Sequence, residues 1–307
     1  MVDHGARLVR VASSSSTRLG ARPADPYVTF GMRAFYKMSG SGNDFVFVDV
    51  RQEDPGDLTT PERIRSVCAR GTGVGADGIV FFGPSAAGAD IGIRYFNGDG
   101  SLGELCGNAT LCTVRLAAVL GVDVGAGLRI ETDAGVMTAR LAAGLPEFDL
   151  GPVNCVQTEA PIGRVAGERR IGYAVAGVPH VVVLVDAVET VDVAARGRSL
   201  CHHSATGAAG ANVNFVAPAA DSGRGAGEWD IRTYERGVES ETLACGTGSV
   251  ATSTMLRAWG VAAISPVRLW TRSGLPLDVT VQRSGDAWTA ALRGQARLVF
   301  RGELIDA

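Results

Sequence analysis

Lysine is nearly absent from this 307-residue chain: Lys37 is the only one, and the other basic residues are arginines. An enzyme that uses pyridoxal phosphate holds it through a Schiff-base lysine, and only Lys37 could serve. The scarcity therefore favours chemistry without a cofactor. Runs of Lys and Arg are also missing, and the net charge is −3, which argues against nucleic acid or an anionic membrane as a partner.

Cysteine pairs of the C-x-x-C type are absent, so no structural zinc site or other metal centre is expected. The six cysteines are too sparse for a disulfide scaffold. They are Cys68, Cys106, Cys112, Cys155, Cys201 and Cys245. No apolar stretch approaches the length of a membrane span. A reducing, cytoplasmic environment is the natural expectation, and it is the one that a working thiol needs.

The composition is that of a globular protein, with 46% hydrophobic and 20% charged residues, and the length suits two domains. Residues 1–31 differ from the rest. They contain a run of four serines followed by a mix of proline, glycine and arginine, without periodicity or the apolar core of a secretory signal. We interpret this segment as a disordered extension or an upstream start of translation.

Both halves of the remaining chain show the same order of elements. Strand patterns are frequent, at residues 45–49, 78–82, 91–96, 129–132, 136–141, 181–186, 211–216 and 229–234. Helices are predicted at residues 61–69, 106–120, 191–201 and 245–259. Each half thus has strands, an acidic loop and then a buried helix headed by cysteine. This indicates an internal duplication with a cleft between the halves, where small molecules bind.

Two cysteines occupy matching positions at these predicted helix starts. Each is followed by glycine and a small polar residue, in Cys106-Gly107-Asn108 and Cys245-Gly246-Thr247. The helix dipole and the free N–H groups of a first turn favour a thiolate, and glycine lets a ligand approach the backbone. The other four cysteines fit the usual role of buried small hydrophobes. Two such thiols suggest a pair that works on one substrate.

Two glycine-rich segments invite a nucleotide-binding interpretation that the order of elements does not support. Residues 37–45 form a turn between strands, which carries Asn43. Residues 70–78 follow a helix and lead into a strand, the reverse of a dinucleotide fingerprint. These glycines are therefore expected to build loops beside the cleft.

Other polar residues join the thiols in one candidate constellation. They are Asn43, Asn97, His180, Asn212, Glu235 and Arg236. Taken alone, a histidine is usually structural and an arginine beside a glutamate is usually a surface pair. Arginine is also the standard clamp for a carboxylate. Two helix N-termini and an arginine describe an amino-acid site better than a phosphate site.

The motifs in this order resemble the diaminopimelate epimerase family over residues 32–307. They are Lys37-Met38…Gly42-Asn43-Asp44-Phe45, Arg70…Gly75-Ala76-Asp77-Gly78, Asn97-Gly98-Asp99-Gly100-Ser101…Cys106-Gly107-Asn108, Pro179-His180, Asn212-Val213-Asn214-Phe215 and Tyr234-Glu235-Arg236-Gly237…Ala244-Cys245-Gly246-Thr247-Gly248. The resemblance implies an α/β (α+β) fold of two pseudo-symmetric domains, each a curved, mostly antiparallel sheet around a central helix. The domains would span residues 32–151 and 152–291, and the last strand, about 292–307, would return to the first.

The resemblance also implies cofactor-independent epimerisation of LL- to meso-diaminopimelate, in lysine and peptidoglycan biosynthesis. Cys106 and Cys245 would be the two acid–base groups, supported by His180 and Glu235. The substrate would be held by Asn43, Asn97, Gly107, Asn108, Asn212, Glu235, Arg236, Gly246 and Thr247. The expected partner is a small amino-acid substrate, with a homodimer left open.

Three departures from the family pattern keep other functions in view. Ser39 stands where the family usually has His, Ala109 and Leu111 where it has Gly and Arg, and Val178 where it has Asn. The missing asparagine belongs to the substrate pocket, so a racemase of another amino acid, such as histidine, is the first alternative. A redox switch in which Cys106 and Cys245 form a reversible disulfide is the second.

Overall fold

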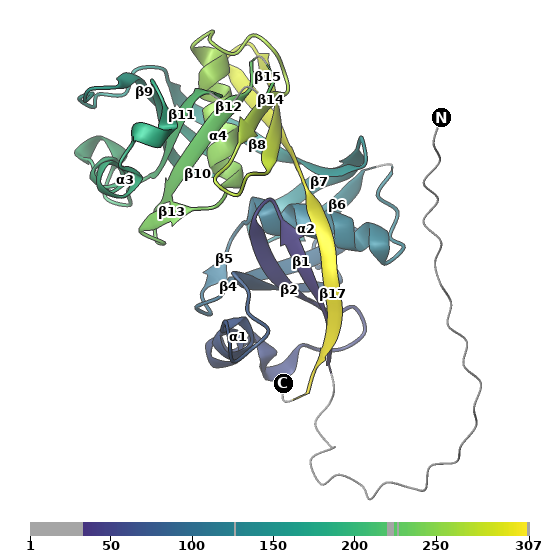
Figure 1. The fold of residues 1–307 in the computed structure, drawn as a ribbon. Helices are drawn as coiled ribbons and strands as arrows, with labels where there is room; N and C mark the ends of the chain where they lie inside the picture. The colour runs from purple at the N-terminus through teal and green to yellow at the C-terminus, as the bar shows by residue number, and fades with distance from the viewer. Residues whose placement is uncertain (1–32, 126, 220–223, 226, 306–307) are drawn as a thin grey trace, which may run out of the picture.

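The computed structural model describes residues 33–125, 127–219, 224–225 and 227–305. The predicted extension at residues 1–31 lies outside this range. The described chain forms two domains, one above the other in Figure 1, each a curved sheet wrapped around one helix. The predicted α+β fold class is therefore confirmed.

The first half of the chain builds the lower domain of Figure 1. Its elements are β1 (Arg33–Gly40), β2 (Asn43–Asp49), α1 (Pro61–Cys68), β3 (Gly78–Gly83), β4 (Ile91–Asn97), β5 (Leu102–Gly103), α2 (Gly107–Val119), β6 (Leu128–Thr132), β7 (Gly135–Ala142) and β8 (Leu145–Gln157). The strand pairs are antiparallel except β2–β3 and β4–β6. Helix α2 lies inside this sheet, in contact with β1, β7, β8 and the final strand.

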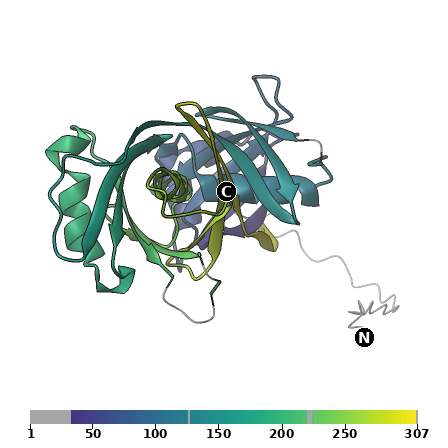
Figure 2. The same cartoon turned by 90° about the horizontal axis from the view of Figure 1, so that it is seen from above.

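The second half repeats this order in the upper domain. Its elements are β9 (Glu168–Ala176), β10 (Val178–Val185), α3 (Val193–Cys201), β11 (Asn212–Pro218), β12 (Trp229–Glu235), β13 (Ser240–Thr242), α4 (Gly246–Ala258), β14 (Val267–Trp270), β15 (Pro276–Ser284) and β16 (Ala287–Gly294), and β17 (Ala296–Leu304) follows them. The pairs β10–β11 and β12–β14 are parallel, at the positions equivalent to β2–β3 and β4–β6. Figure 2 shows α4 end-on inside its ring of strands.

Local sequence signals account for the helices. The side chain of Thr60 accepts a hydrogen bond from the N–H of Arg63, and Pro61 opens α1, as predicted. All four helices lie within two residues of their predicted bounds. Helices α2 and α4 are buried on nearly every side, since both cross the interior of a closed sheet.

Two strands join the domains. β8 pairs with β7 at its start and with β9 at its end, so one continuous strand passes residue 151, where the domain boundary was predicted. β16 belongs to the upper sheet, but β17 follows after one residue and pairs antiparallel with β1 in the lower domain. The last strand therefore returns to the domain in which the described chain begins, as Figure 1 shows in yellow.

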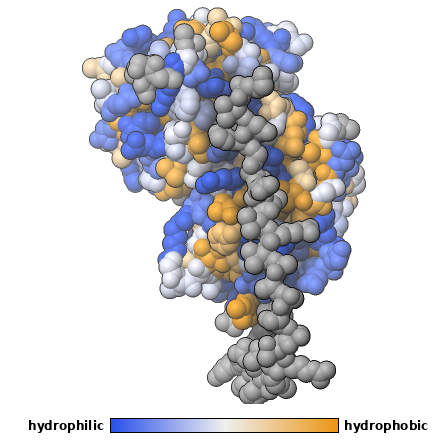
Figure 3. Space-filling model, turned by 45° about the vertical axis from the view of Figure 1, so that its right-hand side comes forward, coloured by the Kyte–Doolittle hydropathy of each residue, from blue (hydrophilic) through white to orange (hydrophobic). Residues whose placement is uncertain are grey.

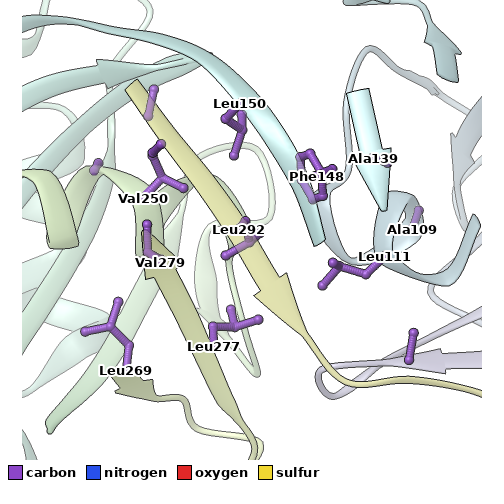
Figure 4. Packing of buried hydrophobic residues seen from close by; sticks show 14 of the residues in the cluster. Ala109, Leu111, Ala139, Phe148, Leu150, Val250, Leu269, Leu277, Val279 and Leu292 are labelled. Atoms are coloured by element: carbon purple, nitrogen blue, oxygen red, sulfur yellow. The ribbon is translucent and has the colours of Figure 1, made fainter. Parts of the chain in front are cut away.

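The hydrophobic core is continuous between the domains. Leu111 of α2 and Val250 of α4 belong to one cluster of buried residues, and Leu292 of β16 belongs to it too. Figure 4 shows Phe148 and Leu292 in the region between the two helices. Full burial of one such side chain contributes about 1.5–3 kcal/mol. This packing fixes the position of one helix relative to the other.

The surface mixes polar and apolar side chains, and Figure 3 shows hydrophobic residues gathered on the lower domain. Val299 and Phe300, both in β17, are among the exposed large hydrophobics. Within the described part of the chain, no helix is long and apolar enough to cross a membrane.

Candidate active site

The starts of α2 and α4 meet head to head between the domains. Cys106 caps α2 with φ −125° and ψ 112°, and Cys245 caps α4 with φ −123° and ψ 113°, so the duplication reproduces the backbone itself. A Cβ placed on Gly107 would lie 3.4 Å from the Cα of Gly246, and one on Gly246 would lie 3.3 Å from the Cα of Gly107. The two glycines therefore allow a contact that brings both cysteines together.

A cavity of about 630 Å³ opens at this contact. It is lined by ten of the residues that the sequence singled out, namely Asn43, Asn97, Cys106, Gly107, Asn108, Glu235, Arg236, Cys245, Gly246 and Thr247. His180 and Asn212 do not line it. Cys106 and Cys245 thus line one cavity whose walls come from the two domains.

Burial raises the pKa of the Cys106 thiol to about 11. The N–H groups of Ala109 and Asn108 act in the opposite direction, as expected at a helix start, and the negative charge of Glu235 adds to the increase. The sequence had led us to expect a lowered pKa from the helix dipole. In the enclosed cleft the loss of hydration outweighs the dipole, so the shift is upward.

Cys245 lies at the positive end of the α4 dipole, as Cys106 does at that of α2, and the carboxylate of Glu235 lies beside it. Its Sγ accepts a hydrogen bond from the N–H of Gly248 at 3.4 Å and lies 3.6 Å from Oγ1 of Thr247. Burial raises the pKa of Cys245 well above its usual value, and the charge of Glu235 raises it further. Burial also raises the pKa of Glu235, whose carboxylate accepts a hydrogen bond from Thr242 Oγ1 at 2.6 Å. Of the two thiols, Cys106 is the more acidic.

His180 lies fully buried behind the cleft. Its Nδ1 is 3.2 Å from Nδ2 of Asn214, an amide that also donates to the carbonyl of Val181. Burial lowers the pKa of His180 to about 3, and the positive charge of Arg236 contributes. The imidazole is therefore neutral at physiological pH. Its partner Asn214 lies next to the start of α4, with Oδ1 close beside Gly248.

Arg236, which lines the cavity, is held by the segment that leads into β11. The guanidinium donates to the carbonyl of Ala209 at 3.1 Å, and the backbone N–H donates to Oδ1 of Asn212 at 2.9 Å. Asn212 was predicted to bind the substrate. Here its side chain is buried behind Arg236 and fixes the backbone of that residue.

The lower-domain wall is a chain of polar contacts. Tyr95 Oη donates to Oδ1 of Asn97 at 2.8 Å, and the Asn97 amide donates to Ser101 Oγ at 3.0 Å. Asn43 donates to a carboxylate oxygen of Asp77 at 2.9 Å. Sequence reasoning named the loops that carry Asp77 and Ser101 but gave neither a role, because nothing local distinguishes them from ordinary turn residues.

None of the departures from the family pattern lines the cavity, although the N–H of Ala109 interacts with the thiol of Cys106. Leu111 is fully buried and Ala109 nearly so, both in the core around α2. Ser39 lies in β1, where it pairs with Asp44 of β2. Val178 begins β10 and is half-buried, and it is not among the lining residues.

Among the described residues, one group of side chains outside the cavity has donor atoms close enough together to bind a metal ion. It consists of Cys201, His202 and Glu239, and none of the three lines the cavity. His202 Nε2 and Glu239 Oε2 already lie 3.0 Å apart, and Tyr234 Oη donates to the same carboxylate oxygen at 3.0 Å. The carboxylate is thus already occupied by protein partners.

Solved structures with similar folds are remote in sequence. A phenazine biosynthesis protein of the PhzF family from Bacillus anthracis matches 90% of this chain and 99% of its own, with a TM-score of 0.70 and 17% identity. A hydroxyproline epimerase from Agrobacterium vitis matches 89% of this chain and 92% of its own, with a TM-score of 0.60 and 16% identity. At such identities the likeness concerns the fold.

Sequence relatives are much closer. The family model described as diaminopimelate epimerase matches residues 35–156 and 172–299. The diaminopimelate epimerase of Gemmatimonas aurantiaca is 44% identical over 88% of this chain and 99% of its own length. That of Aquifex aeolicus is 40% identical over 88% and 97%. The chain belongs to the diaminopimelate epimerase family.

Proposed function

We propose that the chain catalyses the cofactor-independent epimerisation of LL-2,6-diaminopimelate to meso-diaminopimelate, as a cytoplasmic enzyme of lysine and peptidoglycan biosynthesis. The observation that carries this is the meeting of two cysteine-capped helix starts at one cavity. Family membership indicates the substrate, and the two cysteines at one cavity indicate how the reaction proceeds.

Inversion at a carbon needs two acid–base groups. A single base that removes the Cα proton tends to return it to the same face, and no inversion results. Cys106 and Cys245 come from different domains and line the same space, so a Cα placed between them has one thiol on each side. One removes the proton and the other donates its own to the opposite face.

The Cα–H is a weak acid, so its removal requires stabilisation of the enolate-like carboxylate that forms. The first intrahelical bonds run from Thr110 N–H to the Cys106 carbonyl and from Ser249 N–H to the Cys245 carbonyl. The N–H groups before them, at Gly107 and Gly246, have no partner within their own helices. A carboxylate across both starts receives these donors and the positive ends of two dipoles.

The surroundings of the two thiols indicate which one acts as the base and which as the acid. Burial, and after it the charge of Glu235, keeps Cys245 protonated, because loss of hydration and a nearby negative charge both oppose ionisation of a thiol. The pKa of Cys106 is raised less than that of Cys245. The positive charge of a bound substrate's ammonium would favour ionisation of Cys106 further. We assign Cys106 as the base for the stereoisomer whose Cα–H faces it and Cys245 as the acid in that direction, and the two exchange roles in the reverse direction.

The second end of the substrate explains the polar rim. Arg236 offers a guanidinium to a distal carboxylate, and Asn97 offers an amide nearby. A racemase of a single-ended amino acid has no use for this arginine. Because Val178 does not line the cavity, its departure from the family asparagine leaves these contacts intact.

The test is α-proton exchange in D2O, followed by NMR on LL-diaminopimelate and on a panel of single-ended amino acids that includes histidine. We expect exchange and inversion with diaminopimelate alone. Cys106→Ala and Cys245→Ala should each reduce inversion by ~10³-fold or more. Cys155 is exposed, contrary to the prediction that it is a buried structural cysteine, and it lies outside the cleft, so Cys155→Ser is the matched control.

Turnover of diaminopimelate at the wild-type rate by either alanine variant would contradict the two-base assignment. Faster turnover of a single-ended amino acid would favour the racemase alternative. Reversible formation of a Cys106–Cys245 disulfide in a protein that exchanges no α-proton would favour the redox switch.

A further inference from the structure

A short loop of residues 236–239 joins β12 to β13 and forms part of the cavity wall. The flanking residues Glu235 and Ser240 pair with each other across the two strands. The N–H of Glu239 donates to the carbonyl of Glu235 at 2.8 Å and closes the loop. The cavity is lined by residues 235–238 but not by Glu239. Glu239 is therefore next to the wall without being part of it.

Glu239 has a backbone conformation that a glutamate seldom adopts. Its φ is +57°, in the left-handed region that favours glycine. A residue with a side chain is kept in this region by its surroundings, because the conformation is strained. The hydrogen bonds of the Glu239 side chain are contacts that a glycine at this position could not make.

The carboxylate of Glu239 has partners on both of its oxygens. Oε1 accepts from the N–H of Gly237, inside the loop, at 3.2 Å. Oε2 accepts from Tyr234 Oη at 3.0 Å and lies 3.0 Å from Nε2 of His202, which caps the end of α3. Hydrogen bonding with His202, and then with Gly237 and Tyr234, lowers the pKa of Glu239 to about 2, so the carboxylate is charged at physiological pH.

These contacts join the loop to the body of the upper domain. Gly237, whose N–H is held by Glu239, directly follows Arg236 in the chain. The guanidinium of Arg236 is held separately, by the carbonyl of Ala209 at 3.1 Å. The carboxylate thus acts on the backbone that carries the arginine. A loop that is fixed before a ligand arrives has less conformational freedom to lose on binding.

We propose that Glu239 is a positioning residue: its carboxylate holds the loop of residues 236–239 in place, so that Arg236 is already ordered when the substrate binds. The inference rests on the proposed function, in which Arg236 binds the distal carboxylate of diaminopimelate. Because this end of the substrate is remote from the reacting carbon, Glu239 affects binding and not the chemical step.

The test compares Glu239→Gly with Glu239→Ala in steady-state kinetics on LL-diaminopimelate. Both variants remove the carboxylate, but only glycine adopts the left-handed backbone without strain. We expect KM to rise by about three- to tenfold in both variants, with kcat within about twofold of the wild type. Thermal unfolding should show a smaller loss of stability in Glu239→Gly than in Glu239→Ala.

Ala143→Gly is the matched control. Ala143 also has a left-handed backbone, with φ +51°, but it lies in the turn between β7 and β8, outside the cavity. Its replacement relieves the same kind of strain without removing a hydrogen bond of the side chain. It should keep the wild-type KM.

Hydrogen–deuterium exchange of the peptide that spans residues 235–240 gives a second measurement, made on the protein without substrate. Exchange should be faster in both Glu239 variants than in the wild type, because the N–H of Gly237 loses its acceptor. Mass spectrometry follows this peptide.

A KM that rises in only one of the two Glu239 variants would assign the effect to backbone strain or to the freedom of glycine, and would overturn the proposal. Unchanged hydrogen exchange of the loop, or a loss confined to kcat, would overturn it as well. Failure of the wild type to exchange the α-proton of diaminopimelate would refute the proposed function instead. The exchange of the loop needs no substrate, so the two failures are distinguishable.

Discussion

Gly107 and Gly246 lie backbone against backbone, so that a Cβ on either would come within 3.4 Å of the Cα of the other. Each glycine directly follows one of the two cleft cysteines. The separation of the thiols is thus set by the closest approach of two helices, which any larger residue would widen.

The first prediction concerns this contact. In Gly246→Ala the new Cβ would lie 2.9 Å from Leu292 Cδ2 and 3.3 Å from the Cα of Gly107. We expect a loss of about 1–3 kcal/mol in the free energy of unfolding, and a larger proportional loss of kcat. Urea denaturation and proton exchange measure the two effects.

Two further variants separate these causes. Leu292→Val in the Gly246→Ala background should recover stability but not activity, because the contact with Gly107 remains. Gly151→Ala has open space at its Cβ and should be close to neutral in both measurements. Full recovery of kcat in the double variant would contradict the role of the glycine contact.

The second prediction concerns the charge beside Cys245. In the substrate-free protein, alkylation of Cys106 by iodoacetamide should rise with pH up to its pKa of about 11, since only the thiolate reacts. Glu235→Gln removes the charge that raises the pKa of Cys245, so Cys245 should react faster than in the wild type at pH 8. Mass spectrometry resolves the two sites. Glu241→Gln, which changes a neighbouring carboxylate outside the cavity, should have no such effect, and equal acceleration by both variants would refute the pairing.

The third prediction is a pH dependence of stability from His180. In the unfolded chain this histidine binds a proton near pH 6.5, whereas in the folded protein its pKa is about 3. The unfolded state therefore gains a proton between these values, and stability falls as the pH is lowered through that window by about 1.4 kcal/mol per unit. His180→Gln should remove this contribution.

Urea denaturation at pH 7, 5.5 and 4.5 measures the effect as a difference in slope between wild type and variant. The ring of His203 is only half-buried, so His203→Gln is the matched control and should preserve the wild-type slope. Parallel curves for the wild type and His180→Gln would show that His180 is charged in the folded protein.

The fourth prediction assigns Arg236 to binding. Loss of a charge-assisted hydrogen bond costs about 1.5–3 kcal/mol, so Arg236→Ala should raise KM for diaminopimelate ~10- to 150-fold, with a smaller change in kcat. Steady-state kinetics check this. Arg272→Ala, an exposed arginine outside the cavity, should leave KM unchanged. A loss confined to kcat would place Arg236 in the chemical step.

The sequence by itself determined the parts that depend on neighbours along the chain. The threonine and proline at the start of α1, and the Cys-Gly pairs that open α2 and α4, set the helix bounds because capping involves only a few adjacent residues. The order of the motifs identified the family. It also named ten residues of the cavity wall, since most of them belong to two loops and two helix starts.

Tertiary structure alone decided what depends on contacts between distant residues. It reversed the expected pKa shift of Cys106, because burial by both domains outweighs the local dipole. It placed Asn212 behind Arg236 and His180 behind Asn214. It also set Asp77 of the cavity wall against Asn43 and Asp44, which come 34 and 33 residues earlier in the chain. Hydration and pairwise distance are set by packing, and no local pattern in a sequence records them.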